Sequence, residues 1–499
     1  MRLKLFVCAA VAALLAVPVG ASAHPLEVSG GAFSEQLPDV SLLEAQAGRS
    51  HFSGPPPTEF AKTDNMRFLG FSARAAAGSL SLANSDIAFQ GKTAYQGTFP
   101  GFRIIDIRNA SRPKEIINYE NCRHPSGQGD VVIYKDVLTR SWDSASSNGM
   151  PAGGWPCGDS DGTVQAGEEG LHVFDVSDPE NPDVEAFIDL PCGSHTATGV
   201  PDPKNKRLIV YSTPSSGACD GIDVIEIPLR NPSAASYHHF EAAADLIACH
   251  DTGVILGKVL RAACAGGQGF AVWSMDRKDG GSLIDPVLLY TKNMKVELGI
   301  NINTGHSAGF SNDGKTMIFG HEPSGGVQAR CQATGTVLGD ATYPVQTDDM
   351  KSLFFFDTET GALKGQWTLP RPQTSRENCT LHNYNVVPTK KRDVLVKGSY
   401  QSGISVVDFS DLDEIEEVGY ADPVPLSPTA LVVGGDWSSH YYNGLIYQSD
   451  ITRGFLSWQF AGREVRGARK LDRLNPQTQE FTVSDRGRDD DSDSDSDSD

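Results

Sequence analysis

Seven similar segments recur along the chain, and this repetition limits the possible folds more than any other feature. Each segment begins with Gly or Ser, continues with four mostly β-forming residues and ends in Asp, Glu, Ser or Gln. A repeat with a spacing of about 50 residues is typical of a propeller or a solenoid. The segments are GFRIID from Gly101, GLHVFD from Gly170, GIDVIE from Gly221, GFAVWS from Gly269, SLFFFD from Ser352, GISVVD from Gly403 and GFLSWQ from Gly454.

A second feature precedes each of these segments: a polar anchor followed by a β-forming run. The complete unit therefore reads as anchor, strand, turn, strand, glycine, strand, turn and outer strand. Four strands repeated seven times predict an all-β fold, a seven-bladed β-propeller of four-stranded blades. A β-helix or an open sandwich is the alternative architecture. The anchored runs are SDIAFQ, GDVVIY, SHTATGV, CHDTGVI, GHSAGF, LHNYNVV and SHYYNGL.

The seventh unit lacks an outer strand of its own, because the sequence after GFLSWQF becomes charged in AGREVRGARKLDRL. Near the N-terminus, NMRFLGFSA is similar to the outer strand IEEVGYADP of the sixth unit. We therefore expect this N-terminal strand to complete the last blade and close the ring. The predicted propeller spans residues 65–470.

The two ends of the chain differ in composition from the repeats. Residues 1–23 have a short basic start, an apolar stretch and small residues before a cleavage site between Ala23 and His24, as in a secretory signal peptide. An N-terminal extension, 24–64, follows. Residues 471–499 end in DDDSDSDSDSD, and such a run of like charges predicts a disordered acidic tail. We expect a secreted protein, extracellular or periplasmic, without a membrane span in the mature chain; an uncleaved anchor is the alternative.

The cysteine content agrees with export. The chain has nine cysteines, and cleavage of the leader removes Cys8 and leaves eight. An even number of cysteines in an exported chain predicts disulfides. The chain contains no CxxC spacing, which argues against a zinc site or a redox pair. On the propeller arrangement, each bridge would tie a loop to a neighbouring blade edge. The predicted pairs are sequential: Cys122–Cys157, Cys192–Cys219, Cys249–Cys264 and Cys331–Cys379.

The anchors give the main functional hypothesis. The first strand of a blade lines the central channel, so the anchors would form a ring around its mouth. Imidazole and carboxylate groups that converge there could bind Cu, Fe or Zn, and an open metal position could act as a Lewis acid. The alternative is structural, with histidine as a hydrogen-bonding anchor in each blade. The ring comprises Asp86, Asp130, His195, His250, His306, His382 and His440.

The segments VLVKGSYQSGISVVDFSD and GLHVFDVSDPENP resemble the LVIVD-repeat family of exported bacterial β-propeller proteins. The resemblance covers roughly residues 65–465 and implies the fold and export, but no agreed activity. A formal net charge of −21 without a basic stripe argues against nucleic acid as a partner. The favoured hypothesis is a module that binds an unidentified ligand or protein through the histidine face. The alternatives are a metal-dependent enzyme, such as an oxidoreductase, and a cell-surface scaffold.

Overall fold

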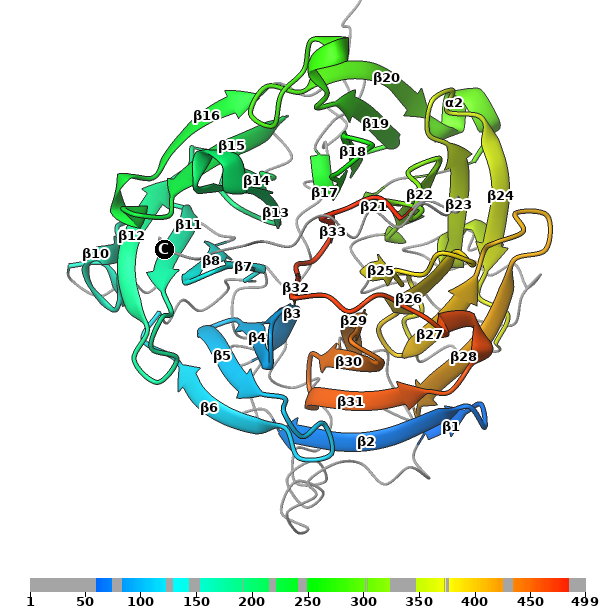
Figure 1. Cartoon of the computed structure of the whole chain (residues 1–499), viewed down its shortest axis with the longest axis horizontal. Helices are drawn as coiled ribbons and strands as arrows, with labels where there is room; N and C mark the ends of the chain where they lie inside the picture. Colours follow the sequence, from blue (N-terminus) through cyan, green and yellow to red (C-terminus); the bar gives the residue numbers. More distant parts are fainter. Residues whose placement is uncertain are drawn as a thin grey trace, which may run out of the picture.

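The computed structural model describes residues 60–73, 83–122, 129–142, 153–191, 193–214, 221–240, 249–300, 302, 304–323, 347–371, 373, 377–424 and 434–483. The expected leader and its cleavage site lie outside these residues. Seven antiparallel sheets are arranged radially around a central channel (Figure 1), so the predicted all-β seven-bladed propeller is confirmed. None of the helices in the described segments is long and apolar enough to span a membrane.

Each blade has four strands, counted from the channel outward. Blades 1 to 3 contain β3 (Asn84–Gln90), β4 (Thr93–Thr98), β5 (Gly101–Asp106) and β6 (Lys114–Tyr119); β7 (Val131–Tyr134), β8 (Val137–Trp142), β11 (Gly170–Asp175) and β12 (Asp183–Asp189); and β13 (Ala197–Asp202), β14 (Arg207–Ser212), β15 (Ile222–Pro228) and β16 (Ser236–Phe240).

Blades 4 and 5 contain β17 (Cys249–Ile255), β18 (Arg261–Gly266), β19 (Gly269–Ser274) and β20 (Val287–Asn293), followed by the short helix α2 (Met294–Leu298); and β21 (Gly305–Phe310), β22 (Thr316–His321), β23 (Ser352–Asp357) and β24 (Leu363–Thr368). Blades 6 and 7 contain β25 (Tyr384–Val386), β26 (Val394–Gly398), β27 (Ile404–Asp408) and β28 (Glu416–Pro423); and β29 (Asp436–Tyr442), β30 (Leu445–Asp450) and β31 (Gly454–Phe460).

The repeated segments that begin with Gly or Ser are the third strands of the blades, as the sequence predicts. At Gly101 a Cβ atom would lie 1.8 Å from the carbonyl oxygen of Tyr119 on the neighbouring outer strand. A side chain cannot be placed there without moving the backbone, so this glycine permits the close approach of the two strands.

The N-terminal strand closes the ring. Strand β2 (Met66–Ala73) pairs antiparallel with β31, in a register that sets Met66 opposite Phe460 and Ala73 opposite Gly454. The prediction for NMRFLGFSA is therefore confirmed. Strand β1 (Phe60–Lys62), from the end of the expected extension, adds a fifth strand to blade 6 by pairing with β28.

Apolar side chains pack between neighbouring blades. At the junction of blades 1 and 7, the ring of Phe89 stacks on Tyr442 with centroids 4.9 Å apart, and Tyr447 packs beside them. Burial of such rings removes a large apolar area from water and is a main stabilising term of the fold. The same packing fixes the angle between blades and so the positions of the inner strands.

Two of the predicted disulfides are present among the described residues. Cys122–Cys157 joins the end of blade 1 to an inserted hairpin of blade 2, β9 (Trp155–Cys157) and β10 (Asp159–Val164). Cys249–Cys264 joins β17 to β18 within blade 4, which corrects the expectation that every bridge reaches a neighbouring blade. Cys379 is also disulfide-bonded. Cys192, Cys219 and Cys331 lie outside the described residues.

Residues 469–483 form an ordered segment, here called the C-terminal strap. It contains β32 (Arg473–Leu474), which pairs with the end of β3, and β33 (Thr478–Gln479), which runs parallel to the end of β17. The strap crosses the channel at the ends of the inner strands (Figure 1, red). The expected boundary of the disordered tail at 471 is therefore too early, because the segment up to Val483 is held by the propeller.

The strap contacts every blade. It pairs with blades 1 and 4 through β32 and β33, and backbone or side-chain hydrogen bonds reach the other five. The contacts with blades 2, 3, 5, 6 and 7 are Ile133 N to Asn475 Oδ1 (2.8 Å), Thr478 Oγ1 to Gly199 O (2.8 Å), Phe310 N to Gln479 Oε1 (3.1 Å), Arg469 N to Pro388 O (2.8 Å) and Asn443 Nδ2 to Leu471 O (2.8 Å).

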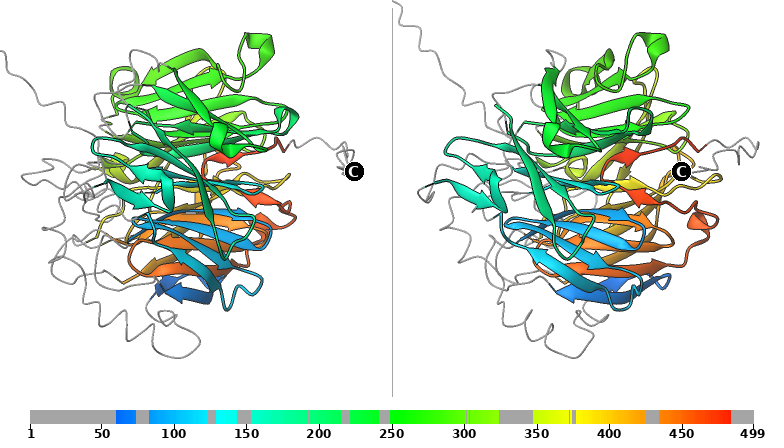
Figure 2. Two further views of the ribbon diagram at one scale, coloured as in Figure 1. Left: turned by 90° about the vertical axis from the view of Figure 1, so that its left-hand side faces the viewer. Right: turned by 60° about the vertical axis from the view of Figure 1, so that its left-hand side comes forward.

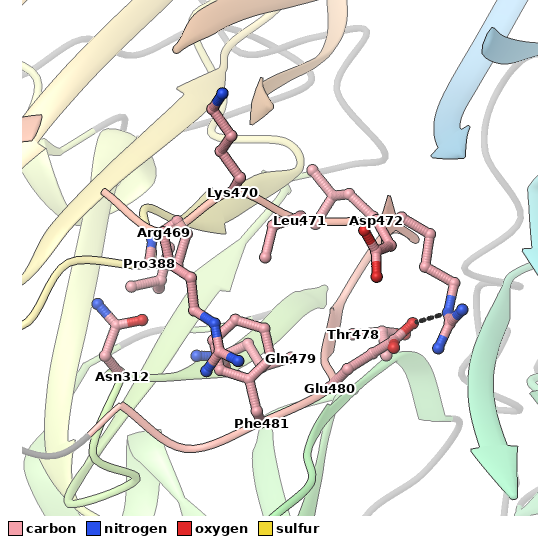
Figure 3. Close-up of a pocket in the computed structure, with 13 residues that line it drawn as sticks. Asn312, Pro388, Arg469, Lys470, Leu471, Asp472, Thr478, Gln479, Glu480 and Phe481 are labelled. Atoms are coloured by element: carbon pink, nitrogen blue, oxygen red, sulfur yellow. Dashed lines mark hydrogen bonds and ion pairs between the residues drawn. The ribbon is translucent and has the colours of Figure 1, made fainter. Parts of the chain in front are cut away.

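The outer surface of the strap carries a pocket of about 160 Å³, which Figure 3 shows in close-up. Its polar rim is internally paired, because Arg473 donates to Glu480 at 2.6 Å. The guanidinium of Arg469 lies 4.4 Å from the ring centroid of Phe481. Side views show the C-terminal end of the described chain leaving from this side of the ring (Figure 2).

Candidate metal centre at the channel mouth

All seven predicted ring residues are buried and none is more than 6% exposed. Six of them lie at or near the start of the inner strands, at the end of the channel opposite the strap. His440 is different, because it lies further along its inner strand, β29, than the predicted common position. The repeat therefore brings six of the seven residues to one place. Whether they bind a ligand stays a prediction at this point, because burial also suits a structural anchor.

Four of the histidines form a continuous row across blades 3 to 6. The ring centroids of His195 and His250 are 4.5 Å apart, and those of His250 and His306 are 4.2 Å apart. His306 and His382 follow with a separation of 4.4 Å. Successive blades thus present one imidazole each at van der Waals distance from the next.

Asp86 and His440 form a separate pair in the ring. His440 Nε2 lies 3.1 Å from Asp86 Oδ1, and Asn383 Nδ2 donates to Asp86 Oδ2 at 2.8 Å. Burial raises the pKa of Asp86, but the hydrogen bond and charge of His440 outweigh it and lower that pKa below its usual range. Burial and the charges of Asp86 and Asp251 hold the pKa of Asp130 well above its usual range. Asp86 and His440 are thus an internally paired anchor, whereas the Asp130 carboxylate accepts a hydrogen bond from Ala197 N at 3.3 Å.

Glu322 joins the row of histidines although the repeat does not predict it. It directly follows β22 and is fully buried. Its Oε2 is 3.8 Å from His306 Nε2, its Oε1 is 3.8 Å from His382 Nε2, and Tyr400 donates its hydroxyl to Oε1. Burial raises the pKa of Glu322 to about 8. In the sequence, Glu322 directly follows the second strand of blade 5 and stands away from the repeated position of the histidines.

Asp251 is the second carboxylate of the cluster, directly after His250 in β17. Its Oδ1 lies 3.2 Å from His250 Nδ1, and its Oδ2 lies 3.8 Å from His306 Nδ1. A carboxylate beside Nδ1 favours the tautomer with hydrogen there, which leaves Nε2 as the acceptor or metal ligand. His382 has the same tautomer, because its Nδ1 lies 2.6 Å from the carbonyl oxygen of Trp437, which can only accept a hydrogen bond. Its Nε2 is therefore also left as the acceptor or metal ligand.

The inward atoms are spaced as ligands of one ion would be. One ligand atom each from His250, His306 and Glu322 lie within 4.8 Å of one another. His195 Nε2 is 2.9 Å from His250 Nε2. Two nitrogens bound at about 2.0–2.1 Å to one ion stand about 2.9–3.4 Å apart at angles of 90–109°. The pair of histidines already has this spacing, and the 3.8 Å pairs reach it with a contraction of about 0.4 Å.

Comparison with known proteins does not identify a family for this chain. No family model and no curated protein matches the chain, so its similarity to LVIVD-repeat proteins stays a resemblance. Among solved structures, the β-propeller domain of Myceliophteria thermophila Cps50 (Swd1) aligns over 76% of this chain and 98% of its own, with 9% identity and a TM-score of 0.43. The N-terminal domain of Nup159 aligns over 79% and 95%, with 11% identity and a TM-score of 0.42. These values are too low to bear on function.

Proposed function

We propose that this protein is an exported propeller that binds one transition-metal ion at the channel mouth. His250, His306 and Glu322 would hold the ion, and the neighbouring His195 and His382 would supply further nitrogen ligands. The observation that carries the proposal is the convergence of this buried His–His–Glu group. Nitrogen and carboxylate donors together suit Zn, Fe or Cu.

The carboxyl group of Glu322 distinguishes this site from a ring of structural anchors. An anchor needs one fixed partner, as the Asp86–His440 pair provides. Glu322 has such a partner in the Tyr400 hydroxyl, but its two oxygens also face the imidazoles of His306 and His382, in a site where burial raises its pKa to about 8. A bound cation would favour its ionised form and offset the cost of burying the carboxylate.

The geometry also defines what these residues would do around an ion. Asp251 orients the Nε2 atom of His250 inward, and Tyr400 fixes one oxygen of Glu322. An ion with an open position there would supply Lewis-acid or redox chemistry. His195 Nε2 and His250 Nε2 lie 2.9 Å apart, so one ring donates to the other. For both Nε2 atoms to bind one ion, the donor ring would have to carry its hydrogen on Nδ1 instead.

The propeller fold is equally consistent with a ligand- or protein-binding module, which the sequence favours over a metal-dependent enzyme. A bound metal reconciles the two hypotheses, because the ion is itself a ligand and can recruit a second one. A module without metal would use the same histidines only as blade anchors.

Metal stoichiometry tests the proposal. Residues 24–499 are purified, offered Zn²⁺, Cu²⁺ and anaerobic Fe²⁺ in turn, dialysed, and analysed by inductively coupled plasma mass spectrometry. We expect about one ion per chain, and loss of that ion in His250→Ala/His306→Ala/Glu322→Gln. His238→Ala/His239→Ala, which removes two exposed histidines of β16, is the matched control and should retain the ion. A folded wild-type protein that retains none of the three ions would refute the proposal.

A further inference from the structure

We propose that Gln477 of the C-terminal strap is a positioning residue for this metal centre. It enters from the far end of the channel and holds Asp251, the carboxylate that orients two of the ligands. The inference rests on the proposed function and extends it, because it makes the strap, at the far end of the channel, a part of the site.

The contacts form a continuous path. Gln477 O accepts a hydrogen bond from Val254 N at 2.9 Å, which fixes the strap against β17. Its side chain then points along the channel, where Nε2 donates to Asp251 Oδ2 at 3.2 Å. Asp251 in turn contacts His250 Nδ1 at 3.2 Å and faces His306 Nδ1 at 3.8 Å. One side chain of the strap thus fixes the carboxylate shared by ligands from two blades.

The backbone of Gln477 supports a role for its side chain. Five non-glycine residues among the described segments have a positive φ, and three of them, Lys135, Lys206 and Asn443, lie at exposed or half-buried positions. The two buried ones are Tyr400, with φ 46°, and Gln477, with φ 54°. Glycine adopts this conformation without steric cost, whereas other residues do not.

These two buried residues share one further property: each donates a hydrogen bond to a carboxylate of the candidate centre. Tyr400 donates to Glu322, and Gln477 donates to Asp251. Strained backbone that persists at a site is held there by its surroundings and is concentrated where function requires it. A side chain that reaches a buried carboxylate accounts for the presence of a non-glycine residue at both positions.

The strap does not need this side chain in order to dock. Asn475 makes two hydrogen bonds with the backbone of Ile133, at 2.8 and 2.9 Å, and Thr478 Oγ1 donates to Gly199 O. Loss of the Gln477 amide should therefore leave the strap in place and act locally, through the freedom of the Asp251 carboxylate. Loss of a group that contacts a ligand directly weakens metal affinity by about 10–100-fold, and Gln477 acts one step further out, through Asp251, so we expect the lower end of that range.

Two substitutions separate positioning from folding. Gln477→Gly removes the side chain and relieves the positive φ, so this variant should unfold at the same temperature as the wild type or higher. Gln477→Met roughly keeps the volume and replaces the amide, including the N–H donor, with an apolar thioether. Asn475→Ala is the matched control, because it removes strap hydrogen bonds without touching Asp251.

The measurements are the Kd for Co²⁺, by competition with a chromophoric chelator, and the visible spectrum of bound Co²⁺. We expect both Gln477 variants to raise the Kd by about 10-fold and to alter the spectrum, while Asn475→Ala lowers the unfolding temperature and keeps the Kd within about twofold. If both Gln477 variants have the Kd and the spectrum of the wild type, the positioning role of Gln477 is wrong, but the proposed metal site is not. Absence of Co²⁺ binding by the wild type would instead overturn the proposed function, and the positioning role with it.

Discussion

Lys397 is a buried lysine in β26, and we expect its burial to lower the stability of the folded protein by a measurable amount. Its ammonium donates to Ser399 Oγ and lies 5.4 Å from the ring centroid of Trp367. Burial, with the nearby charge of Arg371, lowers its pKa from 10.5 to about 7. Folding thus takes a group that water would keep protonated and makes its charged form unfavourable.

Lys397→Met should therefore stabilise the protein at pH 7, by about 1–4 kcal/mol, because an apolar chain of similar length replaces a desolvated ammonium. Between pH 7 and 10.5 the unfolded chain holds the lysine proton while the folded protein releases it. The free energy of unfolding of the wild type should therefore increase as the pH rises through that range. Urea titrations of both proteins at several pH values measure the difference. Equal stability and equal pH dependence would contradict this account of Lys397.

At this scale the repeat predicts which side chains line the channel mouth, because a residue at one position of every blade occupies one place in the ring. It does not predict Glu322, Asp251, Tyr400 or Gln477. Each of these lies off the repeated position, and its contribution depends on a side-chain direction or a backbone conformation that arises only in the folded ring.

Among the elements, the strap was the hardest to predict. Strands β32 and β33 are two residues long each, too short to show an alternating pattern. The neighbouring Ser/Asp run also dominates the composition of the C-terminal region. By contrast, the glycine-led third strands and the closing strand β2 were predictable, because apolar faces and turn residues repeat in every blade.

Removal of the strap should destabilise the propeller, because it crosses all seven blades and makes several buried hydrogen bonds of about 1 kcal/mol each. A chain ending at Ala468 should lose about 3 kcal/mol or more of unfolding free energy. A chain ending at Val483 keeps the strap, lacks residues 484–499, which include the Ser/Asp run, and should stay within about 0.5 kcal/mol of the full chain. Chemical denaturation compares the three proteins. Equal loss in both truncations would assign the effect to the Ser/Asp run instead.

At the scale of the whole molecule, closure of the ring brings the repeated anchor residues of the blades together at one end of the channel. Residues far apart in the sequence become neighbours because each blade places its anchor at the same radius. Closure by β2 fixes the number of blades, and the strap covers the end of the channel opposite the histidines. The sequence could predict this gathering of histidines, but not the distances between them, which depend on how the blades pack.

Anomalous X-ray scattering from crystals of residues 24–499 soaked in Zn²⁺, recorded on both sides of the zinc absorption edge, tests the central claim most directly. The account predicts one strong peak at the channel mouth, at about 2.0–2.1 Å from Nε2 of His250 and His306 and from an oxygen of Glu322. A structure from such crystals with no peak there, and with these side chains bonded only to one another, would show that the ring serves the blades alone.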